Sequence, residues 1–145
     1  MAPAPSSVLG LDVGAQRIGV AAASLAAGLA RPLTTLRHDD GFLPALRKLI
    51  ETENAQALVV GLPRGLDGQH TAQTQAVESF TDELRRNCGL PVHLQDEAVT
   101  SKQAETELES RGKPYRRGDI DALAATYILE DWLAGQRPRQ QGTAA

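Results

Sequence analysis

Two apolar runs near the N-terminus, separated by only three residues, constrain the fold most strongly. They are Val8–Val13 and Arg17–Ser24, and the segment between them, Gly14-Ala15-Gln16, is typical of a tight turn. The pattern predicts a β-hairpin. The first strand carries Asp12, and a carboxylate on a buried strand is unfavourable unless a partner compensates it. Any fold for this chain must therefore explain what Asp12 contacts.

The rest of the chain alternates between strand and helix patterns. A third strand is expected at Leu29–Arg37, and the continuously apolar segment Ala57–Pro63 indicates a buried parallel strand. A last strand is expected at Pro91–Glu97. We therefore predict an α/β fold with a five-stranded mixed sheet, three strands antiparallel and two parallel, and helices on both faces. The expected helices are Phe42–Asn54, Thr71–Cys88, Thr100–Arg111 and Asp119–Leu133.

The length and charge of the chain exclude several classes of protein. The 145 residues suit one domain, which we expect at 7–135, with disordered ends at 1–6 and 136–145. A net charge of −3 argues against a uniformly basic nucleic-acid-binding protein. One cysteine, Cys88, cannot form an internal disulfide, and the three histidines lack metal-ligand spacing. We expect no signal peptide, no membrane contact and a cytoplasmic location.

Three acidic residues fall where the predicted fold would bring them together. Asp12 ends the first strand, Glu97 ends the last strand, and Asp121 lies in the first turn of the last helix. The carboxyl ends of parallel strands share one edge of a sheet, where ligands bind. Three carboxylates without matching histidines are typical of a site for Mg²⁺. Such a site can cleave phosphodiester bonds with a pair of metal ions.

Each acid also has a purely structural explanation. Asp12 could bind the amides of the turn that follows it. Glu97 could be a surface acid, and Asp121 could be favoured by the helix dipole, with Asp119 as the N-cap. The residues alone leave both explanations open.

A basic segment, Arg111–Arg117, precedes the helix that carries Asp121. It holds no acid, and its Tyr115 could stack on a base. The segment could contact a nucleic-acid backbone or be a solvated loop. Arg17 could likewise bind phosphate or pair with an acid. The basic residues of the segment are Arg111, Lys113, Arg116 and Arg117.

Four blocks of sequence, in order and at the same spacing, resemble the YqgF/RuvX family. They are GLDVGAQRIGVAAAS, ALVVGLPRGLDGQHTAQTQAVESFTDEL, LPVHLQDEAVTS and DIDALAATYILEDWL. Members of this family are Holliday-junction-resolvase-like proteins, also described as nucleases of pre-16S ribosomal RNA. The resemblance implies an RNase H-like fold, nuclease chemistry with Mg²⁺ or Mn²⁺, and a role in rRNA maturation.

The resemblance also assigns roles to residues. It carries catalytic and metal-binding roles onto Asp12, Glu97 and Asp121, and a lid onto the Gly-rich segment 61–68. Ala98 departs from the family pattern, which has arginine there and could hold phosphate with it. We expect the segment 64–70 to be mobile. The expected substrate-binding residues are Arg17, Arg64, Lys113, Arg116 and Arg117.

We therefore expect a metal-dependent nuclease that acts on structured RNA or branched DNA. Ribosomal precursor particles are a further expected partner, and the protein is expected to be a monomer or homodimer. One alternative is a ribosome-assembly or nucleic-acid-binding module with little or no catalysis. Another is a fragment of a sugar-kinase or actin-type ATPase, because the first hairpin also resembles their phosphate-binding hairpin; that fold needs two such domains.

Overall fold

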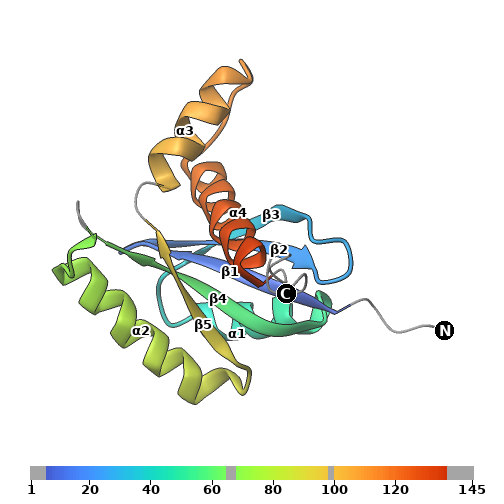
Figure 1. Cartoon of the computed structure of the whole chain (residues 1–145), viewed down its shortest axis with the longest axis vertical. Coiled ribbons are helices and arrows are strands. Elements are labelled where there is room, and N and C mark those ends of the chain that lie inside the picture. The colour runs from blue at the N-terminus through green and yellow to red at the C-terminus, as the bar shows by residue number, and fades with distance from the viewer. Residues whose placement is uncertain (1–5, 65–67, 98–99, 137–145) are drawn as a thin grey trace, which may run out of the picture.

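The first strand lies at the centre of the sheet, as the apolar hairpin predicted. In the computed structural model, which describes residues 6–64, 68–97 and 100–136, the strand order is β3-β2-β1-β4-β5 (Figure 1). β1 pairs antiparallel with β2 and parallel with β4, which in turn is parallel with β5. The predicted mixed sheet is confirmed. The strands are β1 (Ser7–Val13), β2 (Arg17–Ser24), β3 (Ala30–Arg37), β4 (Ala55–Pro63) and β5 (Val92–Glu97).

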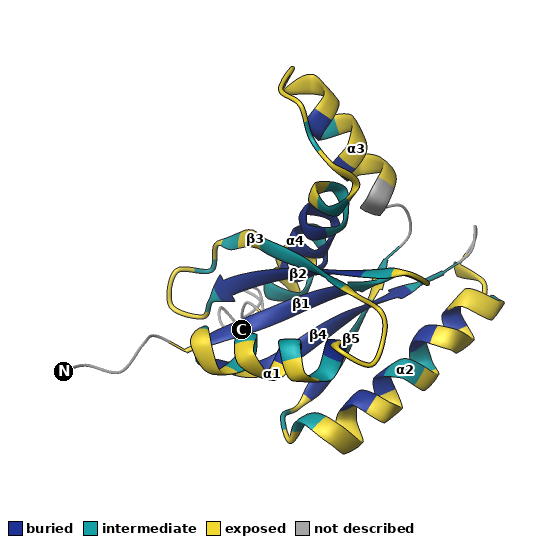
Figure 2. Ribbon diagram, turned by 180° about the vertical axis from the view of Figure 1, so that it is seen from behind, coloured by how far each residue is buried: buried dark blue, intermediate teal, exposed yellow. Residues whose placement is uncertain are grey.

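One face of the sheet carries large aliphatic side chains and is covered by two helices. These are α1 (Phe42–Thr52) and α2 (Ala72–Cys88), seen in front of the sheet and beside it in Figure 2. The Thr71 hydroxyl caps the start of α2, and Gly89, with a left-handed φ of 71°, ends it as predicted. The main apolar core lies on this face and includes Leu9, Leu11, Ile18, Val20, Leu58 and Val60.

The opposite face carries mostly small residues, together with Val8 and Val59, and is crossed by α4 (Arg117–Gln136) (Figure 1). Gly10, Gly19 and Gly61 lie on three strands at the points of closest approach. A Cβ atom at Gly10 would lie 2.5 Å from Leu129 Cγ, and one at Gly19 would overlap the backbone carbonyl of Asp121. Because a larger residue would push the helix away, these glycines determine where α4 crosses the sheet.

The helix α3 (Thr100–Ser110) packs against α4 and extends away from the sheet (Figure 1). α4 begins two residues earlier than predicted, so its first residue belongs to the basic segment. Asp119 consequently lies inside the first turn, where its Oδ2 accepts a hydrogen bond from the Arg116 amide at 2.9 Å. The prediction that Asp119 is the N-cap is therefore wrong.

Several expectations concern parts of the chain that are not described. Residues 65–67 of the segment expected to be mobile, the Ala98 position, and all but Ser6 and Gln136 of the two ends fall in this group. Within the described ranges, no helix combines the length and apolar character needed to cross a bilayer.

Candidate active site

Asp12 lies at the C-terminal end of β1 and shares a sheet face with Gly10, two residues earlier, against which α4 packs. The turn after it is closed by the Gly14 amide, which donates to the Arg17 carbonyl at 2.8 Å. Among the described residues we find no hydrogen bond from the turn amides to Asp12. Burial, and then the charge of Asp121, raises the pKa of Asp12 to about 6. The turn therefore does not explain this carboxylate.

Asp121 is placed beside Asp12 by the close approach of α4 to the sheet at Gly19, the strand partner of Asp12. Its side chain is 17% exposed, and its Oδ2 accepts a hydrogen bond of 2.7 Å from Arg17 Nε. Of the two expected roles for Arg17, pairing with an acid is the one seen. This pair joins the hairpin to the last helix, 104 residues later.

Glu97 ends β5, opposite Pro63 of β4, on the same edge of the sheet. Its Oε1 atom is enclosed and has no hydrogen-bond donor within the described ranges. Its pKa rises to about 8, because of burial first, then a hydrogen bond with Asp131 and the charges of Asp131, Asp12 and Asp96. Two ionised carboxylates cannot hydrogen-bond, so Glu97 and Asp131 form this bond only when they share a proton.

The acids thus form a row in which Asp12 interacts electrostatically with Asp121 on one side and Glu97 on the other. Asp131, from α4, extends the row and was not foreseen. The position of Asp131 depends on where α4 crosses the sheet. The glycines on the strands, Gly10, Gly19 and Gly61, are the sequence feature that marks this crossing. Mutual repulsion among these groups favours either protonation or a cation.

The chemistry of the row fits a hard divalent cation, because every atom that could bind a metal is an oxygen. In addition, the enclosed Glu97 Oε1 atom accepts no hydrogen bond from the described residues. As the side chains are placed, however, no three potential ligand side chains in the described ranges surround a common point closely enough to bind one ion. Asp121 is instead held by Arg17. The predicted ligand set of Asp12, Glu97 and Asp121 stays a prediction.

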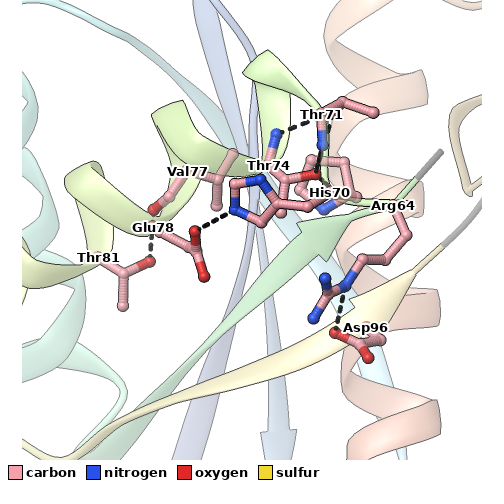
Figure 3. Close-up of polar contacts among 9 residues, drawn as sticks. Arg64, His70, Thr71, Thr74, Val77, Glu78, Thr81 and Asp96 are labelled. Carbon is pink, nitrogen blue, oxygen red and sulfur yellow. Dashed lines mark hydrogen bonds and ion pairs between the residues drawn. The ribbon is translucent and has the colours of Figure 1, made fainter. Parts of the chain in front are cut away.

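Arg64 lies at the same edge, next to Glu97. Its amide donates to the Glu97 carbonyl at 3.2 Å, and its guanidinium pairs with Asp96 at 3.3 Å (Figure 3). Close by, the Thr74 hydroxyl donates to the Pro63 carbonyl at 2.5 Å and fixes the start of α2 to the end of β4. These contacts place one expected substrate-binding arginine beside the acids.

His38 supports the turn that follows Asp12, a role that no sequence pattern indicates. Its amide donates to the Gln16 carbonyl at 2.9 Å, and its Nδ1 lies 2.7 Å from the Gly14 carbonyl oxygen. Because these contacts come from the end of β3, the turn is held between three strands. His38 therefore positions the backbone next to Asp12 without touching the acids.

The basic segment lies on the other side of the first turn of α4. Lys113 and Arg116 line a cavity between α3, β3 and α4, whereas Arg117 is the exposed first residue of α4. Arg111 also lines the cavity, but it pairs with Glu107. The structure thus brings Arg17 and Arg64 to the acids and does not bring the other expected basic residues into direct contact with them.

Comparison with known sequences gives matches along nearly the whole chain. A family model described as "RuvX: Holliday junction resolvase" matches residues 6–135. A protein of Crocosphaera subtropica is 40% identical over 135 residues, which are 90% of this chain and 94% of the relative. A protein of Moorella thermoacetica is 41% identical over 133 residues, covering 87% and 93%. Both carry the name "Putative pre-16S rRNA nuclease".

Solved resolvases share the fold. The RuvC protein of T. thermophilus in complex with a Holliday junction superposes with a TM-score of 0.53 at 17% identity, covering 90% of this chain and 95% of that one. The fowlpox virus Holliday junction resolvase gives a TM-score of 0.53 at 10% identity, covering 89% and 99%. At such identities the likeness concerns the fold alone, and it confirms the RNase H-like architecture.

Proposed function

Because the chain belongs to the RuvX family, as its four sequence blocks indicated, we propose that it cleaves phosphodiester bonds at the sheet edge formed by Asp12, Glu97 and Asp121. Family membership makes the chain a nuclease and nucleic acid its substrate. The observation that supports this location is the position of Asp12, which interacts with both other acids and has a raised pKa. Perturbed carboxylates grouped at one edge are typical of a catalytic site.

We infer that Asp12, Glu97 and Asp121 hold Mg²⁺ or Mn²⁺. When bound, such an ion stabilises negative charge on the phosphate and lowers the pKa of water. Without a cation, the raised pKa of Glu97, about 8, favours a protonated carboxyl at neutral pH, which can then donate a hydrogen bond to Asp131. Without a cation, the Arg17 guanidinium neutralises Asp121.

Arg17 and Arg64 lie at two ends of the acidic row, and in our proposal they attract the phosphate backbone to it. An acidic site repels a polyanion, so nearby guanidinium groups are needed to offset that repulsion. Lys113, Arg116 and Arg117 extend the positive charge around the start of α4, where a longer substrate passes.

The names of the relatives suggest the finer substrate. We propose 5′-end maturation of pre-16S rRNA in the cytoplasm, on RNA free or in ribosomal precursor particles, with branched DNA as a second substrate. A monomer presents one acidic row, whereas a homodimer presents two, as symmetric cleavage of a four-way junction requires.

The test is cleavage by the purified full-length chain. A 5′-labelled pre-16S rRNA fragment and a four-way DNA junction are each incubated with Mg²⁺, Mn²⁺ or EDTA. We expect cleavage only with a divalent cation. Asp12→Asn should slow it by about 100- to 1,000-fold, the usual cost of removing one group that stabilises the transition state.

The matched control is Asp82→Asn, which removes an equal charge from an exposed residue of α2 that pairs only with Arg85 among the described residues. It should cleave like the unaltered protein. Cleavage in EDTA, or an Asp12→Asn rate equal to that of the control, would contradict the proposed site. Metal-independent binding without any cleavage would instead favour a nucleic-acid-binding module.

A further inference from the structure

A cavity of about 570 Å³ lies on the side of α4 that faces away from the acidic row. Its walls are the edge strand β3 at 32–35, the end of α3, the basic segment and the first two turns of α4. The volume is in the range of pockets that bind small molecules and single nucleotide units. Asp119 and Ala122 line the cavity, whereas Asp121 between them faces Arg17. Only the width of one helix, about 10 Å, therefore separates the cavity from the acids.

The cavity is positively charged. Lys113 and Arg116 line it, and neither side chain has an ion-pair partner among the described residues. Asp119, the only acid among the described residues that line the cavity, accepts a hydrogen bond from the Arg116 amide, which partly satisfies its carboxylate. Two unpaired cations in a concave surface favour an anion such as a phosphate group.

Tyr115 supplies an aromatic surface in the same wall. It is half-buried, packs against the apolar cluster between α3 and α4, and donates from its hydroxyl to Glu109 Oε1 at 3.3 Å. The ring is thus held in place while it lines the cavity. The chain has only five aromatic residues of the Phe, Trp and Tyr types. Tyr115 is the only one of them that lines this cavity.

The wall opposite the basic segment is the outer strand of the sheet. β3 pairs only with β2, so backbone groups on its free side have no strand partner within the described residues. Unpaired amide and carbonyl groups of an edge strand can hydrogen-bond the edge of a base. The Thr35 hydroxyl donates to the Gly118 carbonyl at 2.5 Å and holds this strand against α4.

We infer that this cavity binds one unpaired nucleotide of the substrate, with its base on Tyr115 and its phosphate between Lys113 and Arg116. The inference rests on the proposed nuclease function, because it assigns the cavity to the same substrate strand. A base enclosed in the cavity cannot remain paired in a duplex. The preferred substrate therefore has a single-stranded segment next to the cleaved bond.

The test is binding in EDTA by the full-length chain, measured by fluorescence anisotropy. The probes are a labelled RNA of about eight nucleotides, the DNA of the same sequence, and the blunt RNA duplex. We expect the single strands to bind more tightly than the duplex. Tyr115→Leu should weaken single-strand binding about tenfold or more, with little effect on the duplex, because the stacked base is lost. Tyr115→Phe keeps the ring and should bind normally.

A second variant tests the charges independently of the ring. Lys113→Gln with Arg116→Gln should reduce the slope of log affinity against log salt by about one for each lost phosphate contact. The matched control, Lys48→Gln with Arg86→Gln, removes the same charge from exposed positions on α1 and α2 and should leave the slope unchanged. Both variants alter only exposed side chains, so this comparison holds even if Tyr115→Leu does not fold.

The inference fails if the Lys113/Arg116 variant has the single-strand slope of its control, or if folded Tyr115→Leu weakens single strands and duplex equally. Cleavage assays with Mg²⁺ separate the two proposals. If the protein cleaves normally but the Tyr115 and Lys113/Arg116 variants bind single strands like their controls, this inference alone is contradicted. If those variants weaken single-strand binding but the unaltered protein does not cleave, the proposed function alone is contradicted.

Discussion

The two faces of the sheet differ in the residues that they bury. The α1 and α2 face buries branched aliphatic side chains such as Leu58, Ile18 and Val20, which contribute most of the apolar core. The α4 face buries mainly alanines and glycines, together with Val8 and Val59, and places Asp12 at its edge. The first face therefore contributes most of the stability. The second face has small side chains, which let α4 pack closely and bring its acids next to Asp12. Stability and function should respond differently to mutation on the two faces.

The largest difference in stability should come from Leu58→Ala compared with Asp12→Asn. Leu58 is fully buried, and its truncation should lower the free energy of unfolding by about 2–5 kcal/mol. Burial raises the pKa of the Asp12 carboxyl, so its ionised form is unfavourable in the folded state. Asp12→Asn removes this charge, and the free energy of unfolding should therefore rise at neutral pH. Urea denaturation in EDTA measures both. A large loss of stability in Asp12→Asn would mean that Asp12 has a structural role instead.

Gly19→Ala should separate activity from stability. The added Cβ overlaps the Asp121 carbonyl, so α4 must move, at a cost of about 1–3 kcal/mol. Cleavage should fall further than this loss of stability explains, since Asp121 moves with the helix. Gly135→Ala in the same helix meets no atom within 4 Å and should be neutral or stabilising by up to about 1 kcal/mol. Equal cleavage by the two variants would show that the approach at Gly19 is unimportant.

The acids should also make stability depend on pH. Folding raises the pKa of Glu97 from 4.5 to about 8 and that of Asp12 from 3.8 to about 6. The folded state then binds more protons than the unfolded state, so the free energy of unfolding should fall as pH rises through these intervals. Glu97→Gln should flatten the fall between pH 6 and about 8, as followed by urea denaturation in EDTA. A stability that rises over that interval would contradict the assignment.

The smallest effect on stability is expected from two ion pairs. Arg17 pairs with Asp121 at 2.7 Å on the α4 face, and Arg31 pairs with Glu53 at 2.6 Å at the far end of the strands. Replacing either arginine with glutamine should cost no more than about 1 kcal/mol, because both guanidinium groups are partly exposed. Only Arg17→Gln should alter nucleic-acid cleavage. If Arg31→Gln alters it equally, Arg17 has no special relation to the acids.

The sheet could be predicted from the sequence because strand periodicity and turn residues are local signals. The hairpin around Gly14, the buried strand β4 and the stop of α2 at Gly89 all follow from short-range patterns. Asp12 and Glu97 could be placed at one edge because parallel strands end together.

The path of α4 could not be predicted in the same way, because it depends on contacts between distant strands and the helix. Gly10, Gly19 and Gly61 span 51 residues of sequence, yet all three contact the same helix. No local sequence pattern shows that they do so. The Arg17–Asp121 pair and the contact of Asp131 with Glu97 follow from that path. The predicted start of α4 is two residues too late, because the basic segment before Asp119 contains no residue that strongly favours an N-cap.

The most direct measurement compares cleavage by Asp121→Asn and Asp119→Asn, two residues apart in one turn of α4. Asp121 faces Arg17 and Asp12, whereas Asp119 binds the Arg116 amide on the opposite side of the helix. With Mg²⁺ and a labelled pre-16S rRNA fragment, Asp121→Asn should cleave about 100-fold more slowly or worse, and Asp119→Asn should cleave almost normally. Loss of cleavage in Asp119→Asn with normal cleavage in Asp121→Asn, or normal cleavage in both, would contradict the acidic row as the catalytic site.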